Sequence, residues 1–441
     1  MRLSGWGQFP KHDATHHSPR TLDELDELVN SESSIARGNG RAYGDSAVNR
    51  FSTIDMRNFN KLLSFNSQSG ELVAESGVLL SDVIDVFLPR GWFPKVTPGT
   101  KFVTLGGMAA VDVHGKNHHK DGSFSDHVNW LEVFLGNGKT EKCSRSSNPE
   151  LFNWSLGGMG LTGIITRLSF TLRPVQTSWI AQRKIVAENI DRAIDIFEDT
   201  IADSTYSVAW IDCLARKEKL GRSIITLGDH AGINELPKTY RETPFAYPMK
   251  KNLRIPFNLP SKLINQMVIS AFNSLYFSLE KKKPSSSIVD WDTFFYPLDC
   301  ILDWNKMYGK RGFTQVQCVF PLDSSRIALC EILKLTSTEN CGSFLAVLKR
   351  FGKQSSPISF PMEGYTLALD FPISDRTLNV IKKLHAVVTD YGGRFYLAKD
   401  SMLTEDELKK SDKRFLDFAK YRVANRMTET FNSEQSKRLG I

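Results

Sequence analysis

A stretch at residues 105–122 combines a glycine pair with a run of imidazole and ammonium side chains, in the order LGGMAAVDVHGKNHHKDG. Imidazoles bind metals and transfer protons, and ammonium groups bind anions, so a zinc site, a basic patch and an active-site floor are all open interpretations. His114, His118 and His119 are a poor zinc set, because no cysteine or suitably placed carboxylate accompanies them. We therefore expect no metal, and a solvated basic loop remains the simplest alternative to a catalytic role.

A glycine-rich stretch, RGNGRAYGD at residues 37–45, is the second candidate. Glycine adopts positive φ without strain, so the backbone N–H groups of this loop can converge on a pyrophosphate while Arg37 and Arg41 supply positive charge. The spacing is not that of a Rossmann turn, and a surface turn remains equally open. Two further small-residue segments, at 97–110 and 156–165, suggest that all three contact one extended, flat ligand.

Short strands with few helices must position these segments, which favours an α+β fold over a doubly wound sheet. The pattern changes after Pro174 to longer elements, so we expect a domain boundary near residue 176. Gln315 and Gln317 share one face of a predicted strand, so both amides can point into a site or both can point to solvent. The expected helices cover 21–30, 80–91 and 189–202, and the expected strands cover 71–76, 128–138, 163–172, 314–321 and 365–371.

Residues 255–283 are predicted to form one apolar-rich helix that ends in Glu280 and three lysines. Such a helix either packs into the core or lies on a membrane surface, where the lysines would contact anionic headgroups. The sequence leaves both interpretations open.

The composition is that of an ordinary globular protein: 441 residues, 41% hydrophobic, 24% charged and a net charge of +7. The modest positive excess suits a phosphate-bearing ligand, and no nucleic-acid motif is present, so we expect no nucleic-acid partner. The six cysteines lack a CxxC pair, which favours reduced thiols. The first residues contain no apolar segment, so we expect a cytoplasmic protein or one peripheral to the inner membrane, without a signal peptide or membrane-spanning helix.

The motifs RGNGRAYGD, TPGTKFVTLGG and GGMGLTGI, in this order, resemble the FAD-binding domain of the vanillyl-alcohol-oxidase-type (VAO/PCMH) flavoproteins. GGMAAVDVHGKNHHKDGSF, FLAVLKRFG, GYTLALDFPI and GGRFYLAKDS are similar to the decaprenylphosphoryl-ribose 2-oxidase family, the flavin subunits of decaprenylphosphoryl-ribose 2-epimerases. The similarity runs from GWG at 5–7 to KRLGI at the other end of the chain.

This resemblance implies FAD as the cofactor. Many relatives attach FAD to a histidine of the first loop, and this chain has Ala42 and Tyr43 there, so we predict non-covalent FAD. The residues expected to contact FAD are Gly38, Asn39, Gly40, Arg41, Ala42, Tyr43, Thr100, Thr104, Gly106, Gly107, Val111, His114, Ile165 and Tyr396.

The resemblance also assigns the substrate pocket. Lys399 and His114 are the expected catalytic residues, with Lys399 either a base or an electrostatic anchor for an alkoxide or a phosphate. Ala368 stands where the best-known members carry a cysteine, so inhibitors that capture that thiol are expected to fail here. The expected substrate-binding residues are Lys116, Asn117, His118, Gln315, Gln317, Lys349, Ala368 and Lys399.

The implied architecture is an FAD-binding domain at 1–176, a substrate domain on an antiparallel sheet at 177–393, and a segment at 394–441 that returns to the FAD-binding domain. The implied reaction oxidises the C2 hydroxyl of a polyprenyl-phosphoryl ribose to the 2-keto sugar, and an NAD(P)H-dependent short-chain reductase would complete epimerisation to the arabinose form for cell-envelope glycan synthesis. Two alternatives remain: an oxidase of a soluble alditol or aldonolactone, and a catalytically silent FAD-binding partner of a glycan assembly complex.

Overall fold

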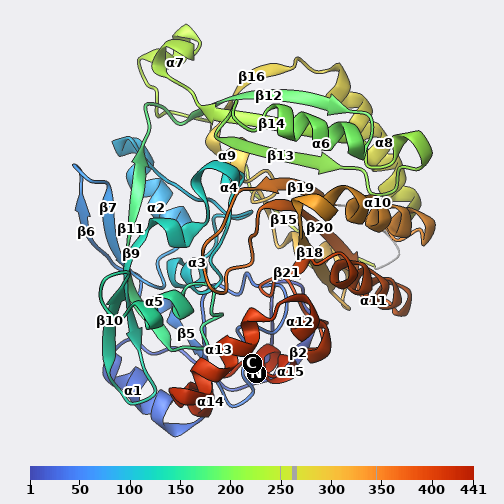
Figure 1. Cartoon of the computed structure of the whole chain (residues 1–441). Helices are drawn as coiled ribbons and strands as arrows, with labels where there is room; N and C mark the ends of the chain where they lie inside the picture. The colour runs from blue at the N-terminus through green and yellow to red at the C-terminus, as the bar shows by residue number, and fades with distance from the viewer. Residues whose placement is uncertain (249, 261–265, 344) are drawn as a thin grey trace.

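The computed structural model describes residues 1–248, 250–260, 266–343 and 345–441. A large antiparallel sheet with its helices forms one part of the molecule, and smaller sheets from the first third of the chain form the other (Figure 1). Helices and strands are mixed without a βαβ pattern in the large sheet, in agreement with the predicted α+β class.

The first third of the chain forms a small parallel sheet, β3-β5-β4, and an antiparallel sheet, β10-β9-β11-β7-β6, with β8 paired to β11. Strand β7 alternates in burial because its Leu72 and Ala74 face the core. The strands are β1 (Arg2–Ser4), β2 (Lys11–Asp13), β3 (His16–His17), β4 (Ser34–Arg37), β5 (Ser52–Asp55), β6 (Leu62–Asn66), β7 (Glu71–Glu75), β8 (Trp92–Pro94), β9 (Val128–Phe134), β10 (Thr140–Ser144) and β11 (Ile164–Pro174).

Short helices connect these strands. The Thr21 side chain accepts a hydrogen bond from the backbone N–H of Glu24 and so starts α1. In the same way Thr104 accepts from the N–H of Gly107 and starts α3, so this small-residue segment is a helical turn and not wholly irregular. The helices are α1 (Leu22–Ser31), α2 (Leu80–Phe87), α3 (Leu105–Ala110), α4 (His118–Asp121) and α5 (Pro149–Ser155).

The large sheet has the strand order β16-β12-β14-β13-β19-β20-β18-β21, with antiparallel pairing throughout. One face packs on α6, α10 and α11 in a shared apolar core, and the other turns toward the first third of the chain. The strands are β12 (Trp179–Ala187), β13 (Tyr206–Ile211), β14 (Ser223–His230), β16 (Ser286–Asp290), β18 (Phe313–Pro321), β19 (Ala346–Phe351), β20 (Gly364–Pro372) and β21 (Arg394–Phe395). The helices are α6 (Ile190–Asp199), α10 (Leu322–Thr338) and α11 (Asp375–Asp390).

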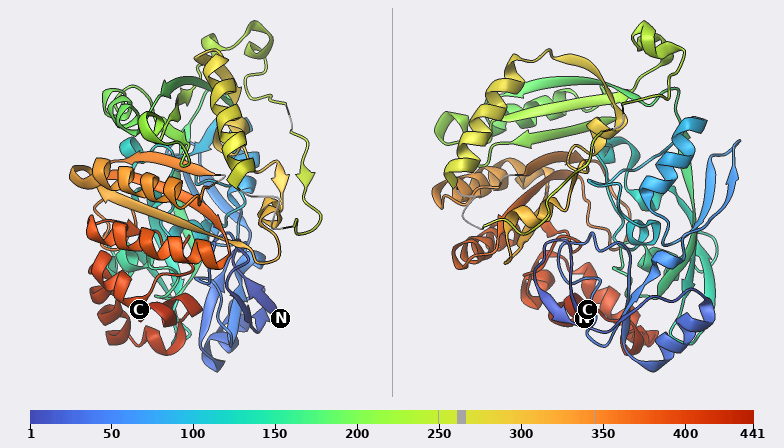
Figure 2. Two further views of the ribbon diagram at one scale, coloured as in Figure 1. Left: turned by 90° about the vertical axis from the view of Figure 1, so that its right-hand side faces the viewer. Right: turned by 180° about the vertical axis from the view of Figure 1, so that it is seen from behind.

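The predicted helix at 255–283 is shorter in the structure, and residues 261–265 of that prediction lie outside the described residues. Helix α8 covers Gln266–Lys282, whereas residues 255–260 are not helical. Pro256 and Pro260 explain the difference, because proline disfavours helical backbone in the residue before it and removes a helical N–H. Helix α8 contacts β14 on the face of the sheet opposite α10 and α11, and Figure 2 shows it in yellow. The connecting segments contain α7 (Lys238–Arg241), α9 (Trp291–Phe295), β15 (Leu253–Arg254) and β17 (Ile301–Leu302).

The last residues return to the start of the chain. The N–H of Asn432 donates to the carbonyl oxygen of Ser34 at 2.9 Å, and the N–H of Glu434 donates to that of Val48 at 2.8 Å. The helices of this segment are α12 (Glu405–Ser411), α13 (Arg414–Ala424), α14 (Met427–Thr430) and α15 (Glu434–Leu439). Among the described residues, no helix has the length and apolar character needed to span a bilayer.

Candidate active site

A cavity of about 830 Å³ lies between the loops of the first third of the chain and the open face of the large sheet. Its volume is within the range of roughly 300–1,000 Å³ that is usual for cofactor and ligand sites. Alternate residues of the sheet face it, because successive side chains of a strand point to opposite faces. The sheet residues that line it are these alternating positions, together with Ala209: Gln182, Lys184, Val208, Trp210, Ile224, Thr226, Gln315, Gln317, Val347, Lys349, Ala368 and Asp370.

The glycine-rich loop after β4 forms one wall, where it is locked to the segment before α3. The Asn39 side chain donates to the carbonyl oxygen of Phe102 at 2.8 Å. A Cβ on Gly38 would lie 2.1 Å from the Thr104 hydroxyl, so only glycine permits this approach. Gly40 has φ +63°, which side chains rarely adopt. The glycines therefore serve close packing and backbone geometry at the cavity wall.

Several buried polar atoms on the cavity wall have no partner in the part of the chain that the structure describes. Such atoms are costly unless a ligand or water pairs with them. They are Arg41 Nε in the glycine loop, Ser76 Oγ, and His114 Nδ1 beside the large sheet. Their distribution from the glycine loop to the large sheet fits an extended polar ligand such as FAD together with a polar substrate.

His114 lies at the sheet side of this cavity. Its Nε2 is 3.0 Å from the side-chain nitrogen of Gln317, and its ring packs between Phe351, Phe360 and Tyr396. Burial, with smaller contributions from neighbouring positive charges, holds the pKa of His114 well below its ordinary value. The imidazole is therefore neutral at physiological pH and accepts the amide hydrogen of Gln317.

The neighbouring residues of the HGKNHH stretch point elsewhere. The Asn117 amide donates to the carbonyl oxygen of Lys95 and to Asp121, and His118 contacts Gln354 at 3.1 Å. Neither residue lines the cavity, so the prediction that both form its wall is corrected: the turn into α4 directs them behind the wall. His119 contacts the carbonyl oxygen of Ser204, and no group of three His, Cys, Asp or Glu in the described ranges is arranged to bind a metal.

Lys399 lies beside the glycine loop, with its ammonium group 3.7 Å from the centre of the Tyr43 ring. Burial lowers the pKa of Lys399, and the nearby Asp370 carboxylate opposes that shift. Burial likewise raises the pKa of Asp370, whose Oδ1 accepts a 2.5 Å hydrogen bond from Gln315. The pKa of Lys399 is thus shifted downward and that of Asp370 upward, so both move toward the neutral range in which general acid–base catalysis is efficient.

Sequence reasoning missed Asp370. It stands two residues after Ala368 on β20, so both side chains face the cavity. A carboxylate within an otherwise apolar buried strand was a usable signal, since unpaired charges are rarely buried without a function.

Two more lysines line the cavity. The Lys116 ammonium donates to the carbonyl oxygen of Phe294, and burial lowers its pKa to about 7. Burial lowers the pKa of Lys349 to about 8. The cavity therefore brings together every predicted cofactor and substrate residue except Asn117 and His118.

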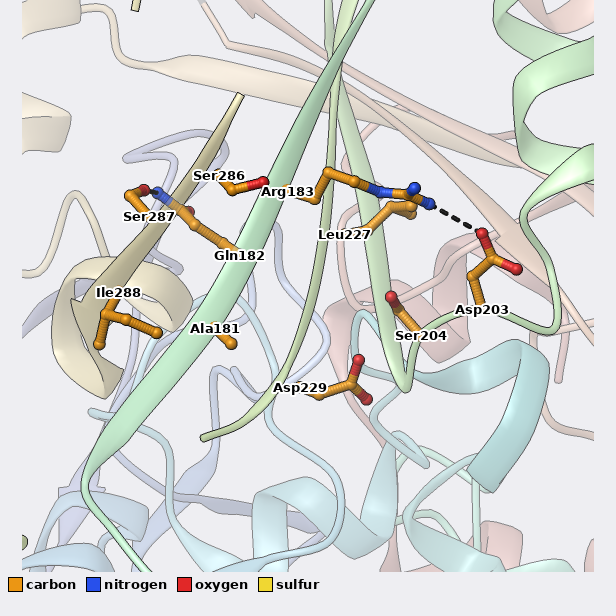
Figure 3. Close-up of a pocket in the computed structure, with 10 residues that line it drawn as sticks. All are labelled: Ala181, Gln182, Arg183, Asp203, Ser204, Leu227, Asp229, Ser286, Ser287 and Ile288. Atoms are coloured by element: carbon orange, nitrogen blue, oxygen red, sulfur yellow. Dashed lines mark hydrogen bonds and ion pairs between the residues drawn. The ribbon is translucent and has the colours of Figure 1, made fainter. Parts of the chain in front are cut away.

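A second, open depression of about 640 Å³ lies at the β16 edge of the large sheet (Figure 3). Arg183 there pairs with Asp203 at 2.8 Å. Among the described residues that line it, no buried polar atom lacks a partner. We therefore assign the functional site to the larger cavity.

The chain is similar to a known protein over its whole length. Residues 18–144 match the family described as FAD binding domain, which contains the glycine loop and α3, and the class of protein is therefore an FAD-binding oxidoreductase. Decaprenylphosphoryl-beta-D-ribose oxidase of Mycolicibacterium smegmatis is 32% identical over 450 residues, covering 100% of this chain and 97% of that protein. The chain belongs to the decaprenylphosphoryl-β-D-ribose oxidase family, as the sequence motifs predicted, and its cofactor is FAD.

Two other relatives define the range of the similarity. An uncharacterized protein of Streptomyces coelicolor is 29% identical over 82% of this chain and 100% of its own length. A putative D-arabinono-1,4-lactone oxidase of Neurospora crassa is 25% identical over 38% of this chain and 31% of its own length. The similarity to the lactone oxidase is thus partial, whereas the first relative matches the substrate-facing sheet as well.

Proposed function

We propose that this protein oxidises the C2 hydroxyl of a polyprenyl-phosphoryl ribose to the 2-keto sugar. The observation that carries the proposal is the 32% sequence identity to a decaprenylphosphoryl-beta-D-ribose oxidase over the whole chain. This similarity includes the segments on both sides of the cavity. The basic lining of the cavity supports it, because a phosphodiester substrate is anionic.

The proposed division has FAD on residues 1–176 and 394–441 and the substrate on residues 177–393. The hydrogen bonds that join Ser34 and Val48 to the C-terminal segment support this division. Non-covalent binding is supported by Ala42 and Tyr43, since neither is the histidine that anchors FAD elsewhere. The residues that would hold FAD are those of the glycine loop, α3, Ile165 and Tyr396.

The reaction needs a hydride acceptor and a base. When bound, FAD supplies the hydride acceptor for the electron pair of the sugar C–H bond. Lys399, whose pKa is lowered by burial, takes the hydroxyl proton in its neutral form, and the Asp370 carboxylate stabilises the ammonium group that results. Gln315 fixes the carboxylate of Asp370, and Gln317 with neutral His114 offers hydrogen bonds to the sugar.

A reductase completes the proposed sequence. A 2-keto sugar that is reduced on the opposite face becomes the arabinose epimer, so an NAD(P)H-dependent short-chain reductase is the expected consumer of the product. Such a reductase would supply the arabinose form for cell-envelope glycan synthesis.

The lipid part of the substrate is proposed to leave the cavity beside α8 and to enter a membrane. Trp210, Phe272 and Tyr276 line the cavity at this end, and Trp210 packs on Tyr276 at 4.7 Å between ring centres. On the outer side of α8, Met267, Leu275 and Leu279 are exposed by 83%, 60% and 51%. An exposed apolar helix face beside three lysines suits the surface of an anionic membrane.

The visible spectrum tests the function directly. The purified FAD-loaded protein is recorded anaerobically before and after addition of a farnesylphosphoryl ribose. Loss of the oxidised flavin band is expected. A band that persists with this sugar but disappears with soluble polyols or aldonolactones would favour the second candidate, which the lactone oxidase similarity supports. A band that no sugar reduces would favour a catalytically silent FAD-binding partner.

A further inference from the structure

Besides Lys184, which pairs with Glu280, three lysines line the large cavity, and their charges are balanced differently. Lys116 belongs to the loop before α4, Lys349 to β19, and Lys399 to the segment after β21. An ammonium group held inside a protein is costly unless an anion or hydrogen-bond acceptors compensate it. The partner of each lysine therefore indicates what the cavity is built to hold.

A carboxylate compensates only one of them. Asp370 acts on Lys399, whereas within the described ranges no carboxylate forms an ion pair with Lys116 or Lys349. In the part of the chain that the structure describes, Lys116 donates to the carbonyl oxygen of Phe294, and the one contact recorded for the Lys349 ammonium is the distant ring of Phe351 at 6.0 Å. The charge of Lys349 lowers the pKa of Lys116 and also that of Lys399, so Lys349 lies within interaction range of both ammonium groups.

The strand register separates this positive region from the acid–base pair. Lys349 lies opposite Thr366 on β20, whereas Asp370 lies four residues further along that strand, opposite Gln315. At the rise of a strand this separation is about 13 Å between the backbone positions. Between Lys349 and Asp370 lies a row of three paired residues, Val347, Ala368 and Gln317. His114 contacts the Gln317 side chain of this row.

We propose that Lys116 and Lys349 form a binding subsite for the phosphodiester of the substrate, distinct from Lys399 and Asp370, which act on the sugar hydroxyl. This inference rests on the proposed function and deepens it. The phosphorus of a ribosyl phosphodiester is joined to C2 through C1 and one oxygen, so the two reacting regions of the ligand are adjacent. Long lysine side chains on either side of the row reach both of them.

The subsite is tested by binding, with probes that contain no sugar. Farnesyl methyl phosphate carries one negative charge, and farnesyl dimethyl phosphate is its neutral counterpart. Each is titrated calorimetrically into the FAD-loaded protein. Lys349→Met and Lys116→Met are each expected to weaken binding of the anionic probe by about 10- to 100-fold, the usual range for a hydrogen bond to a charged group. Binding of the neutral probe should not change.

Lys184 provides the matched control. It lines the same cavity, but its ammonium group pairs with Glu280 at 2.6 Å, and Glu280 keeps Lys283 as a second partner. Lys184→Met should leave the preference for the anionic probe intact. Lys349→Arg keeps the charge and should retain most of the affinity, which separates loss of charge from loss of folding. Equal affinity of the wild type for both probes, or an equal loss in Lys184→Met, would overturn the proposal.

The outcome is independent of oxidation, because neither probe carries a ribose. Preference for the anionic probe without flavin reduction by farnesylphosphoryl ribose would leave the subsite standing and remove the proposed function. Flavin reduction by farnesylphosphoryl ribose without a preference for the anionic probe would support the proposed function and rule out the subsite.

Discussion

The backbone N–H of Tyr43 donates a 2.9 Å hydrogen bond to the carbonyl oxygen of Ala398. This bond joins the glycine loop to the segment that carries Lys399, whose ammonium group covers the Tyr43 ring. Residues more than three hundred positions apart thus share one wall of the cavity, and the position of the proposed base depends on the cofactor loop.

Lys399→Met should lower the rate of flavin reduction by farnesylphosphoryl ribose at least ~100-fold, the usual minimum for loss of a general base. The flavin spectrum should remain, because the loop contacts of Tyr43 are made by its backbone. Stopped-flow absorbance in single turnover measures the rate.

Lys399→Arg separates the two roles that the sequence leaves open. Arginine keeps a positive charge but does not give up its proton in proteins. A base role predicts that this variant is as slow as Lys399→Met, whereas a rate near that of the wild type would identify Lys399 as an electrostatic anchor.

Gly38→Ala should weaken FAD binding. The added Cβ would lie 2.1 Å from the Thr104 hydroxyl, so the glycine loop and the start of α3 must separate, at a cost of about 1–3 kcal/mol. Flavin retained after gel filtration and the melting temperature report the change. Gly232→Ala is the control, since its added Cβ meets side-chain atoms at 3.4 Å only. Full FAD retention in Gly38→Ala would contradict the tight packing of these loops.

Ala368→Cys should place a reactive thiol in the substrate region of the cavity, because Ala368 faces it from β20. Iodoacetamide labelling followed by mass spectrometry is expected to give one adduct more than the wild type, and farnesyl methyl phosphate should slow its formation. In the wild type, we expect labelling at Cys300 and Cys330 only. The other thiols are buried, and burial raises their pKa; they are Cys143, Cys213, Cys318 and Cys341. The same number of adducts in the Ala368→Cys variant as in the wild type would contradict access from the cavity.

Leu275→Glu combined with Leu279→Glu should reduce sedimentation with phosphatidylglycerol vesicles by about 10-fold or more, because two charges replace apolar side chains at the membrane surface. Ile327→Glu is the matched control: Ile327 is 60% exposed, the same as Leu275, but lies on α10. Equal vesicle binding by all three proteins would exclude α8 as the contact.

Binding of farnesyl methyl phosphate should weaken by at least about 10-fold between about pH 6 and pH 9, because Lys116 and Lys349 release their protons in this range. The probe keeps its single charge, so the sign of the change comes from the protein. His114 is neutral throughout, and the pair of Lys399 and Asp370 also titrates here. The double variant Lys116→Met, Lys349→Met measures how much of the pH dependence comes from Lys399 and Asp370. If binding by this variant depended on pH as strongly as binding by the wild type, the assignment of the phosphodiester subsite to Lys116 and Lys349 would be contradicted.

The sequence predicted the α+β fold because helix and strand patterns are local, and it predicted the cofactor because the order of its glycine-rich motifs resembles a known flavoprotein family. Glycine spacing in 37–45 and the small residues of 97–110 report on backbone geometry directly. The helix predicted over residues 255–260 is wrong, although Pro256 and Pro260 argued against it. Apolar content outweighed the proline signal in that prediction.

The site was predicted less well where side-chain direction decides. Neighbouring residues of one loop cannot all face the same cavity, and α4 turns Asn117 and His118 away from it. Lys399 has a nearby carboxylate, whereas Lys349 has none among the residues that the structure describes. This difference depends on the tertiary structure, because Asp370 lies four residues along β20 from the position opposite Lys349. No spacing within a single segment contains that information.

The bond between Tyr43 and Ala398 also has a consequence for biosynthesis. A ribosome delivers the glycine loop more than three hundred residues before Ala398. Until that residue emerges, the nascent chain lacks one wall of the cavity. We therefore expect flavin to bind late in synthesis, and pulse-labelled chains arrested before residue 394 should emerge without bound flavin.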